Sequence, residues 1–425
     1  IDLKADYAGQ SYAVKGLYTR TEKSQDIKNL AAKVMGIDVT GALNIRTDGD
    51  VPMVTGNLNA PEVNLSSFNK NAQKSVQKKT RATIQSLVMV NQISANRIVA
   101  SAPAPDFKAL KAINADILLN IGKLVLADGK SIDNFKTNFN LSGGRLRLDA
   151  LSATFLNVAY KGLFEFNPNG STPVTHLVLN GNNIDFVALA AAFNSKSPLA
   201  ANGDLNIDIT GQGLTPDSFK NTLSGKIEMI AGKGALDMGN SGAAGINLIK
   251  MLYPKTQASE KQNINCGVLR FNANNGVLKA NGILFDSPLA AVVGEGSIDL
   301  VRDNANLLFR HAVKDQQAGS FLNVPIKATG PLAKLTFTPE EKAVAEKVMS
   351  AINGGGSTSS GVPRVDPNAK GNGCVATLNN PNPVMLEQMK TQDAAKATFN
   401  QAKEVIKNIG KPSEALDKLK GLFGR

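Results

Sequence analysis

Apolar and polar residues alternate along much of the chain. The run DLNIDIT at 204–210 places Leu205, Ile207 and Ile209 at every second position, with polar residues between them. The run GKIEMIAG at 225–232 shows the same alternation. Because successive side chains of a β-strand point to opposite faces, each run predicts a strand with one apolar side and one polar side.

Turn-forming residues separate such runs from the start of the chain to about residue 339. They gather in TDGD at 47–50, ADGKS at 127–131, SGGR at 142–145, NPNGS at 167–171 and NANNG at 272–276. Asn, Asp, Gly and Pro supply the backbone angles that tight reversals require. The pattern therefore predicts a mainly β protein whose antiparallel strands are joined by hairpins.

Parts of this pattern recur. Residues 41–68 align without a gap with residues 162–189, and the alignment sets Gly41 opposite Gly162. Residues 143–166 resemble residues 275–300 in the same way, with a slightly longer middle in the second copy. Repeated hairpins of one design stack into an elongated sheet more readily than into a compact globe. We therefore expect an elongated antiparallel sheet built of hairpin repeats.

Helical patterns are few. Residues 186–193 and 244–252 predict short inserted helices. Residues 338–352 begin with a threonine cap, a proline at the first helical position and two glutamates in the first turn, which predicts a helix. Residues 382–410 and 411–425 have the spacing of amphipathic helices, and the second is basic. An anionic membrane, the sheet and a partner protein are the alternatives for its apolar side.

Composition along the chain predicts four parts. They are an N-terminal β repeat with a truncated start and a basic connecting segment (1–100), a β domain that ends in a helix (101–353), a flexible linker rich in Gly, Ser and Pro (354–373), and an amphipathic helical tail (374–425).

The net charge of +12 favours contact with anionic surfaces, which include nucleic acid, phospholipid headgroups and lipopolysaccharide. The densest basic run, at 69–81, contains no aromatic residue and no recognition motif, so we expect a solvated segment and no nucleic-acid partner. Tryptophan is absent and aromatic residues make up 5% of the chain, which argues against carbohydrate binding.

Catalytic and cofactor motifs are missing from the sequence. The GKS at 129–131 lacks the earlier glycine of a phosphate-binding loop, because Leu124 occupies that position. The glycine-rich GNSGAAG at 239–245 is not framed by a strand–helix–strand unit. Two histidines in the whole chain leave little for acid–base or metal chemistry. We therefore expect no enzyme activity, no cofactor and no bound metal.

The two cysteines, Cys266 and Cys374, have no metal-ligand spacing to each other or to a histidine. In an oxidising compartment they could form a disulfide that closes a loop of about 100 residues, with roughly 4–5 kcal/mol of stabilisation at best. Two buried thiols are the alternative.

Several segments together resemble one protein family. FKALKAINADILLNIGKLVLADGKSIDNFKTNFNLSGGRLRLDALSATF at 107–155, the stretch at 201–237, NVPIKATGPLAKLTFTPE at 324–341 and the terminal LKGLFGR are similar to segments of the AsmA family (AsmA/TamB/YhdP-like envelope proteins). The resemblance is strongest over residues 100–353 and is to the C-terminal portion of the family.

The resemblance implies a protein of the Gram-negative envelope, with its bulk in the periplasm and an N-terminal inner-membrane anchor that is not present in this chain. It implies a curved β-groove that binds or conducts phospholipid or another envelope lipid and supports outer-membrane biogenesis. Outer-membrane assembly proteins are further expected partners. Cys266 lies where relatives often have a cysteine, which supports a disulfide with Cys374 in the periplasm.

The apolar sides of the alternating runs are the expected lipid-facing positions. These are Leu205, Ile207, Ile209, Ile227, Met229, Leu269, Phe271, Ile298 and Leu300. Ordinary core packing is the alternative for each of them. The alternative function is that of an assembly or structural factor that regulates protein targeting to the outer membrane, with no lipid on these faces.

Overall fold

The computed structural model describes residues 1–7, 10–34, 36–66, 107–237, 261–314, 325–340 and 359–387. The chain divides into two compact units, Ile1–Asn180 and Gly181–Arg425. The predicted boundaries near residues 100 and 353 lie outside the described residues, as do the basic run at 69–81 and the predicted helix at 244–252.

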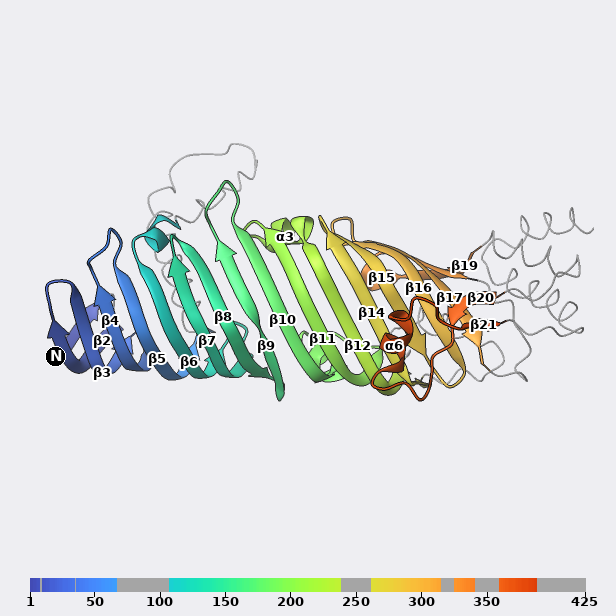
Figure 1. Ribbon diagram of the computed structural model, residues 1–425, viewed down its shortest axis with the longest axis horizontal. Coiled ribbons are helices and arrows are strands. Elements are labelled where there is room, and N and C mark those ends of the chain that lie inside the picture. The colour runs from blue at the N-terminus through green and yellow to red at the C-terminus, as the bar shows by residue number, and fades with distance from the viewer. Residues whose placement is uncertain are drawn as a thin grey trace, which may run out of the picture. The chain divides into compact units, whose positions relative to one another are not determined.

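The prediction of a mainly β protein is confirmed. Within the described ranges, nineteen strands belong to one open sheet that is mostly antiparallel, and two further strands form a separate small sheet. In each unit the strands lie side by side in chain order (Figure 1). The registers show that most strands pair with their neighbours in sequence, as repeated hairpins require. Strands β13 and β14 both pair with β12.

The first unit contains the following strands and one 3₁₀ helix. They are β1 (Asp2–Tyr7), β2 (Gln10–Arg20), β3 (Ser24–Val34), β4 (Ile37–Arg46), β5 (Met53–Asn64), η1 (Phe107–Lys111), β6 (Asn114–Val125), β7 (Ser131–Ser142), β8 (Arg145–Phe155), β9 (Val158–Asn167) and the first part of β10 (Val174–Asp185).

One pair in this unit departs from the predicted antiparallel order. Strands β5 and β6 are parallel, from Met53 opposite Asn114 to Asn64 opposite Val125. Two parallel neighbours cannot be joined by a tight hairpin and need a long connection, which the chain between Asn64 and Asn114 supplies. The sheet is therefore mixed.

The second unit continues from β10 with the following elements. They are α2 (Phe186–Ala192), β11 (Leu199–Gln212), α3 (Pro216–Thr222), β12 (Ser224–Asp237), β13 (Lys261–Ile264), β14 (Cys266–Asn274), β15 (Val277–Asp286), β16 (Ala290–Asp299), β17 (Asn304–Val313), β18 (Ile326–Gly330), η3 (Leu332–Lys334), β19 (Thr336–Pro339), β20 (Ser359–Pro363), α6 (Gly373–Leu378) and β21 (Met385–Glu387).

The helices agree only in part with the sequence predictions. The helix expected at 186–193 is confirmed as α2. Helix α3 was not predicted, although Thr215 caps it and Pro216 is its first residue. The predicted start of the 338–352 helix is wrong, because Thr338 and Pro339 end strand β19 by pairing with β18, and the rest lies outside the described residues.

The repeat extends to local backbone geometry. A Cβ atom at Gly41 in β4 would collide with the carbonyl oxygen of Asn57 in β5, and one at Gly162 in β9 would collide with that of Val178 in β10. Asn57 and Val178 lie opposite each other in the gap-free alignment of the two copies. Glycine is therefore required at the same point of both hairpins, where the neighbouring strand comes too close for a side chain.

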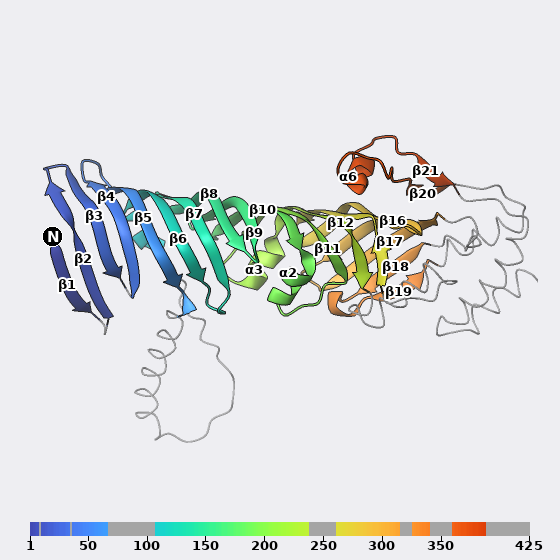
Figure 2. The same ribbon diagram turned by 90° about the horizontal axis from the view of Figure 1, so that it is seen from below.

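Residues Ser359–Glu387 form a segment that we call the C-terminal clip. Figure 2 shows its elements β20, α6 and β21 standing off one face of the second unit's sheet. Helix α6 contacts β14 and β15, and β20 contacts β16 and β17. The clip is joined to β14 by the Cys266–Cys374 disulfide, with the two Cα atoms 5.8 Å apart, so the predicted pairing is confirmed.

The clip corrects two sequence predictions. The predicted flexible linker at 354–373 contains strand β20 and the buried Val362 and Val365 within its described part, because these valines pack on the sheet. The predicted helix at 382–410 is wrong at Met385–Glu387, which pair with β20 as strand β21. The remainder of that segment and 411–425 lie outside the described residues.

Candidate functional site

In each unit the sheet has two faces of different character. We call the face that carries Leu205, Ile207 and Ile209 the front face of the second unit. The face that carries Leu43, Ile45 and the apolar residues paired with them is the front face of the first unit. The other side of the sheet in each unit is its back face.

The front face of the second unit brings the predicted residues together in cross-strand rows. One row joins Leu205, Met229 and Leu269, and the next joins Ile207, Ile227 and Phe271. A third row runs through Ile209, Gly225, Ala273, Leu278 and Ile298. Residues directly opposite on paired strands point to the same face, so the eight predicted strand residues form one continuous apolar surface.

The nine predicted residues share an intermediate exposure. Each keeps part of its side-chain surface accessible among the described residues, and none belongs to the fully buried core. Five of them, Ile209, Ile227, Phe271, Ile298 and Leu300, pack around a buried cluster of Leu223, Ala273 and Leu278. The surface is therefore anchored to the fold on one side and accessible on the other.

Two short helices border this surface. Phe219 of α3 packs into the same cluster as Ile209 and Ile227. Phe186 of α2 is buried against Gly203 of β11. The sequence analysis did not identify Phe219 as part of the site, although the capping signal of α3 places this residue on a helix directly after β11.

The first unit has a front face of the same kind, which the sequence analysis did not list among the site residues. One row contains Ile45, Val54, Ala115, Leu141, Leu146 and Phe166, and the next contains Leu43, Gly56, Ile117, Phe139, Leu148 and Phe164. Helix η1 packs Leu110 against the first row and stacks Phe107 edge-on to Phe166, with ring centroids 5.3 Å apart. The alternation in RLRLDAL and GLFEFN was the available signal.

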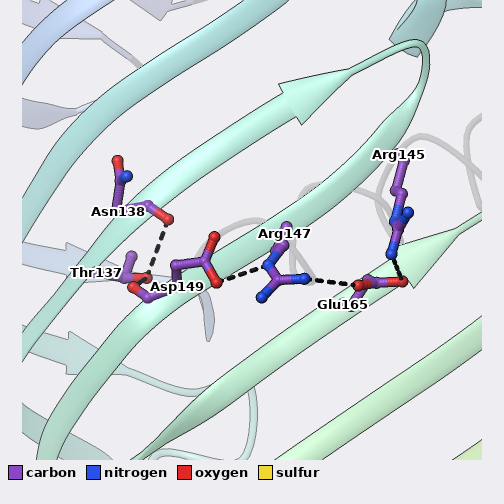
Figure 3. Close-up of polar contacts among 6 residues, drawn as sticks. All are labelled: Thr137, Asn138, Arg145, Arg147, Asp149 and Glu165. Atoms are coloured by element: carbon purple, nitrogen blue, oxygen red, sulfur yellow. Dashed lines mark hydrogen bonds and ion pairs between the residues drawn. The ribbon is translucent and has the colours of Figure 1, made fainter.

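The back face of β8 and β9 in the first unit carries charged side chains. Figure 3 shows Arg147 between two carboxylates: its Nε donates to Asp149 at 2.6 Å and its Nη1 to Glu165 at 3.4 Å. Arg145 pairs with the same Glu165 at 2.6 Å, and this hydrogen bond raises the pKa of the Arg145 guanidinium above its usual value. These four charged side chains therefore pair with one another on β8 and β9.

Titratable groups, possible metal ligands and possible membrane-spanning helices were also compared with the front faces. Burial raises the pKa of the Tyr160 hydroxyl, on the front face of β9, above its usual value. The described part of the chain contains no group of three His, Cys, Asp or Glu side chains arranged to hold a metal ion. None of its helices is long and apolar enough to cross a membrane.

What the front faces can do is bury apolar surface. Each apolar side chain that leaves water on contact with a ligand contributes about 25 cal/mol per Å² of area, and no chemical step is needed. Contiguous rows of partly exposed Leu, Ile and Phe are the kind of surface that marks a binding site for an apolar partner.

Comparison with known families agrees with this architecture. The family model of AsmA matches residues 5–283, which include both front faces except the contributions of Ile298 and Leu300. This match begins nearer the N-terminus than the segment on which the resemblance in sequence was strongest. The curated proteins and the solved structures that were compared contain no match. The chain belongs to the AsmA family, a family of bacterial envelope proteins.

Proposed function

We propose that this protein binds phospholipid, or another envelope lipid, on the front faces of its sheet and thereby supports outer-membrane biogenesis and integrity. It does so from the periplasm, held at the inner membrane. The observation that carries the proposal is the set of cross-strand rows of partly exposed apolar side chains, such as Ile207, Ile227 and Phe271. The AsmA family is not a known enzyme family, in line with a binding role.

Acyl chains suit this surface for a physical reason. The rows present aliphatic and aromatic side chains without a fixed pattern of hydrogen-bond donors, so they reward burial of any long apolar chain. The net charge of +12 favours lipids with anionic headgroups near the protein. Both properties are met by a membrane phospholipid.

The test is native mass spectrometry of the protein extracted gently from a bacterial envelope fraction, with identification of the released lipids. Ile207→Asp places a charge in the middle of the front face of β11. Thr210→Asp introduces the same residue on the back face of the same strand and serves as the matched control. Because an unpaired charge on an acyl-binding surface is costly, we expect Ile207→Asp to lower lipid occupancy at least fivefold and Thr210→Asp to leave it near the wild-type value.

Both variants must first be shown to be folded by circular dichroism. Lipid-free spectra from intact wild-type protein would contradict the proposal and favour the alternative of a lipid-independent assembly factor. Equal lipid occupancy in the two folded variants would contradict the assignment of the front face.

A further inference from the structure

Strand β11 carries a glycine near each end of its front face, and a phenylalanine ring lies on each glycine. Gly203 and Gly211 share the face of Leu205, Ile207 and Ile209, because they lie at alternate positions of the same strand. A Cβ atom at Gly203 would lie 2.8 Å from Cε2 of Phe186, and one at Gly211 would lie 2.5 Å from Cδ2 of Phe219. Both distances are too short for a real side chain, so each ring rests directly on the strand.

The helices that carry these rings are fixed at their ends. The Asp185 side chain accepts hydrogen bonds from the backbone N–H groups of Val187 and Ala188, at 2.9 and 3.1 Å, and so caps α2. The Thr215 hydroxyl accepts from the Ser218 N–H at 3.1 Å and caps α3. The last residue of α3, Thr222, accepts from the Gln212 N–H of β11 at 2.7 Å. The two rings therefore stand at fixed positions along β11.

The space between the rings follows from strand and helix dimensions. Eight residues of strand separate Gly203 from Gly211, which corresponds to about 26 Å at about 3.3 Å per residue. A helix with its side chains has a radius of about 5–6 Å. If each helix covers one radius of the strand on the side that faces the other helix, about 15 Å of the roughly 26 Å stays open. The open strip consists of Leu205, Ile207 and Ile209.

We propose that Phe186 and Phe219 are specificity-determining borders that limit how many acyl chains lie side by side on β11. This inference rests on the lipid-binding function proposed above. Two chains, with carbon contacts of about 4 Å to each other and to each border, need about 12 Å, whereas four chains need about 20 Å. The strip accepts a lipid with two acyl chains and excludes one with four chains laid abreast.

The test offers both classes of lipid to the purified chain. Vesicles contain dioleoyl phosphatidylglycerol and tetraoleoyl cardiolipin in amounts that give equal numbers of acyl chains, and mass spectrometry measures the ratio of the two lipids bound. Both lipids carry one anionic phosphodiester for every two acyl chains, so a change in this ratio between wild type and variant reports on acyl-chain number. We expect an excess of the diacyl lipid on the wild type and at least a threefold rise in the cardiolipin share for Phe219→Ala.

Further variants separate the border role from general loss of packing. Phe186→Ala opens the opposite border and is expected to raise the cardiolipin share in the same direction. If it fails to fold, because Phe186 is 5% exposed, the partly exposed Phe219 decides the test, with Phe219→Leu as a milder substitution. Phe193→Ala is the matched control, since Phe193 directly follows α2 and is 63% exposed, and we expect it to keep the wild-type ratio.

The outcomes distinguish the two proposals. Folded Phe219→Ala or Phe219→Leu protein that binds lipid at the wild-type ratio overturns the border inference and leaves lipid binding intact. A wild type that retains neither lipid overturns the proposed binding of phospholipid, and the inference with it.

Discussion

The back faces of the two units are built in different ways. In the first unit the back face of β8 and β9 carries Arg145, Arg147, Asp149 and Glu165, which pair at the surface (Figure 3). In the second unit the part of the back face of β14 to β17 that lies beneath the C-terminal clip is apolar and buried (Figure 2). The clip contributes Val362, Val365, Cys374 and Leu386 to these clusters, and the sheet contributes Cys266, Val268, Leu284, Ala291 and Ala312.

This difference shows how the sequence of a strand indicates whether another segment, such as the clip, packs on its back face. A strand with one solvated face alternates, as RLRLD does at 145–149. A strand with a covered back face and an apolar front face has consecutive apolar residues, as in Val268 followed by Leu269 and Ile283 followed by Leu284. Broken alternation in β14 and β15 therefore marks the place where the clip packs, and the disulfide fixes it there.

Removing the disulfide is expected to have the largest effect on this comparison. The double variant Cys266→Ser/Cys374→Ser frees a loop with a sequence separation of 108 residues. The entropy of that loop predicts a loss of up to about 4–5 kcal/mol in the free energy of unfolding of the clip and the strands beneath it. Denaturant unfolding, together with limited proteolysis at 359–387, measures the loss.

The first unit provides the internal control for this experiment. Its peptides should keep their wild-type protease resistance in the double variant, because the disulfide does not involve them. Wild-type resistance of the clip in the double variant would show that packing alone holds it in place.

A pair of leucine substitutions compares the two back faces directly. Leu284, on the back face of β15, is 0% exposed, whereas Leu118, on the back face of β6, is 58% exposed. Leu284→Ala leaves a cavity under the clip and should lower the free energy of unfolding by about 2–5 kcal/mol. Leu118→Ala should change it by no more than about 0.5 kcal/mol. Similar losses for both variants, measured by denaturant unfolding, would remove the distinction between a covered and an uncovered back face.

Local patterns in the sequence predicted the mainly β fold and the apolar front-face positions of the second unit, because alternation is a property of each strand alone. Ile207 and Ile227 are in this class, and the structure places them opposite each other. The parallel pairing of β5 with β6 could not be predicted in this way, since it depends on how a long connection returns the chain. Antiparallel hairpins were the natural expectation for strands of this length.

Two errors have different causes: one segment was judged by its composition without its packing partners, and one helix was too short to be recognised. Ser359–Pro363 has the composition of a flexible linker, yet it forms strand β20, because Val362 packs with Ala291 and Ala312 on the back face of the sheet. Helix α3 was missed because its seven residues are too few for a helical period to be visible. Its Thr215-Pro216 start carried the same capping signal that was used for residues 338–352.

The assignment of the front faces to lipid stays a prediction.

The smallest expected effect concerns the ion pairs of the first unit's back face. Arg147 is 43% exposed and pairs with Asp149 and Glu165. Exposed pairs of this kind contribute up to about 1 kcal/mol and are screened by salt. Arg147→Met should therefore lower the free energy of unfolding by no more than about 1 kcal/mol in dilute buffer, and by less in about 1 M salt, where the Debye length falls to about 3 Å. A salt-independent loss above about 2 kcal/mol would mean that the aliphatic part of Arg147 is packed as tightly as the residues beneath the clip. The two back faces would then be stabilised by the same mechanism, burial, and the contrast between a charged open face and an apolar covered one would not hold.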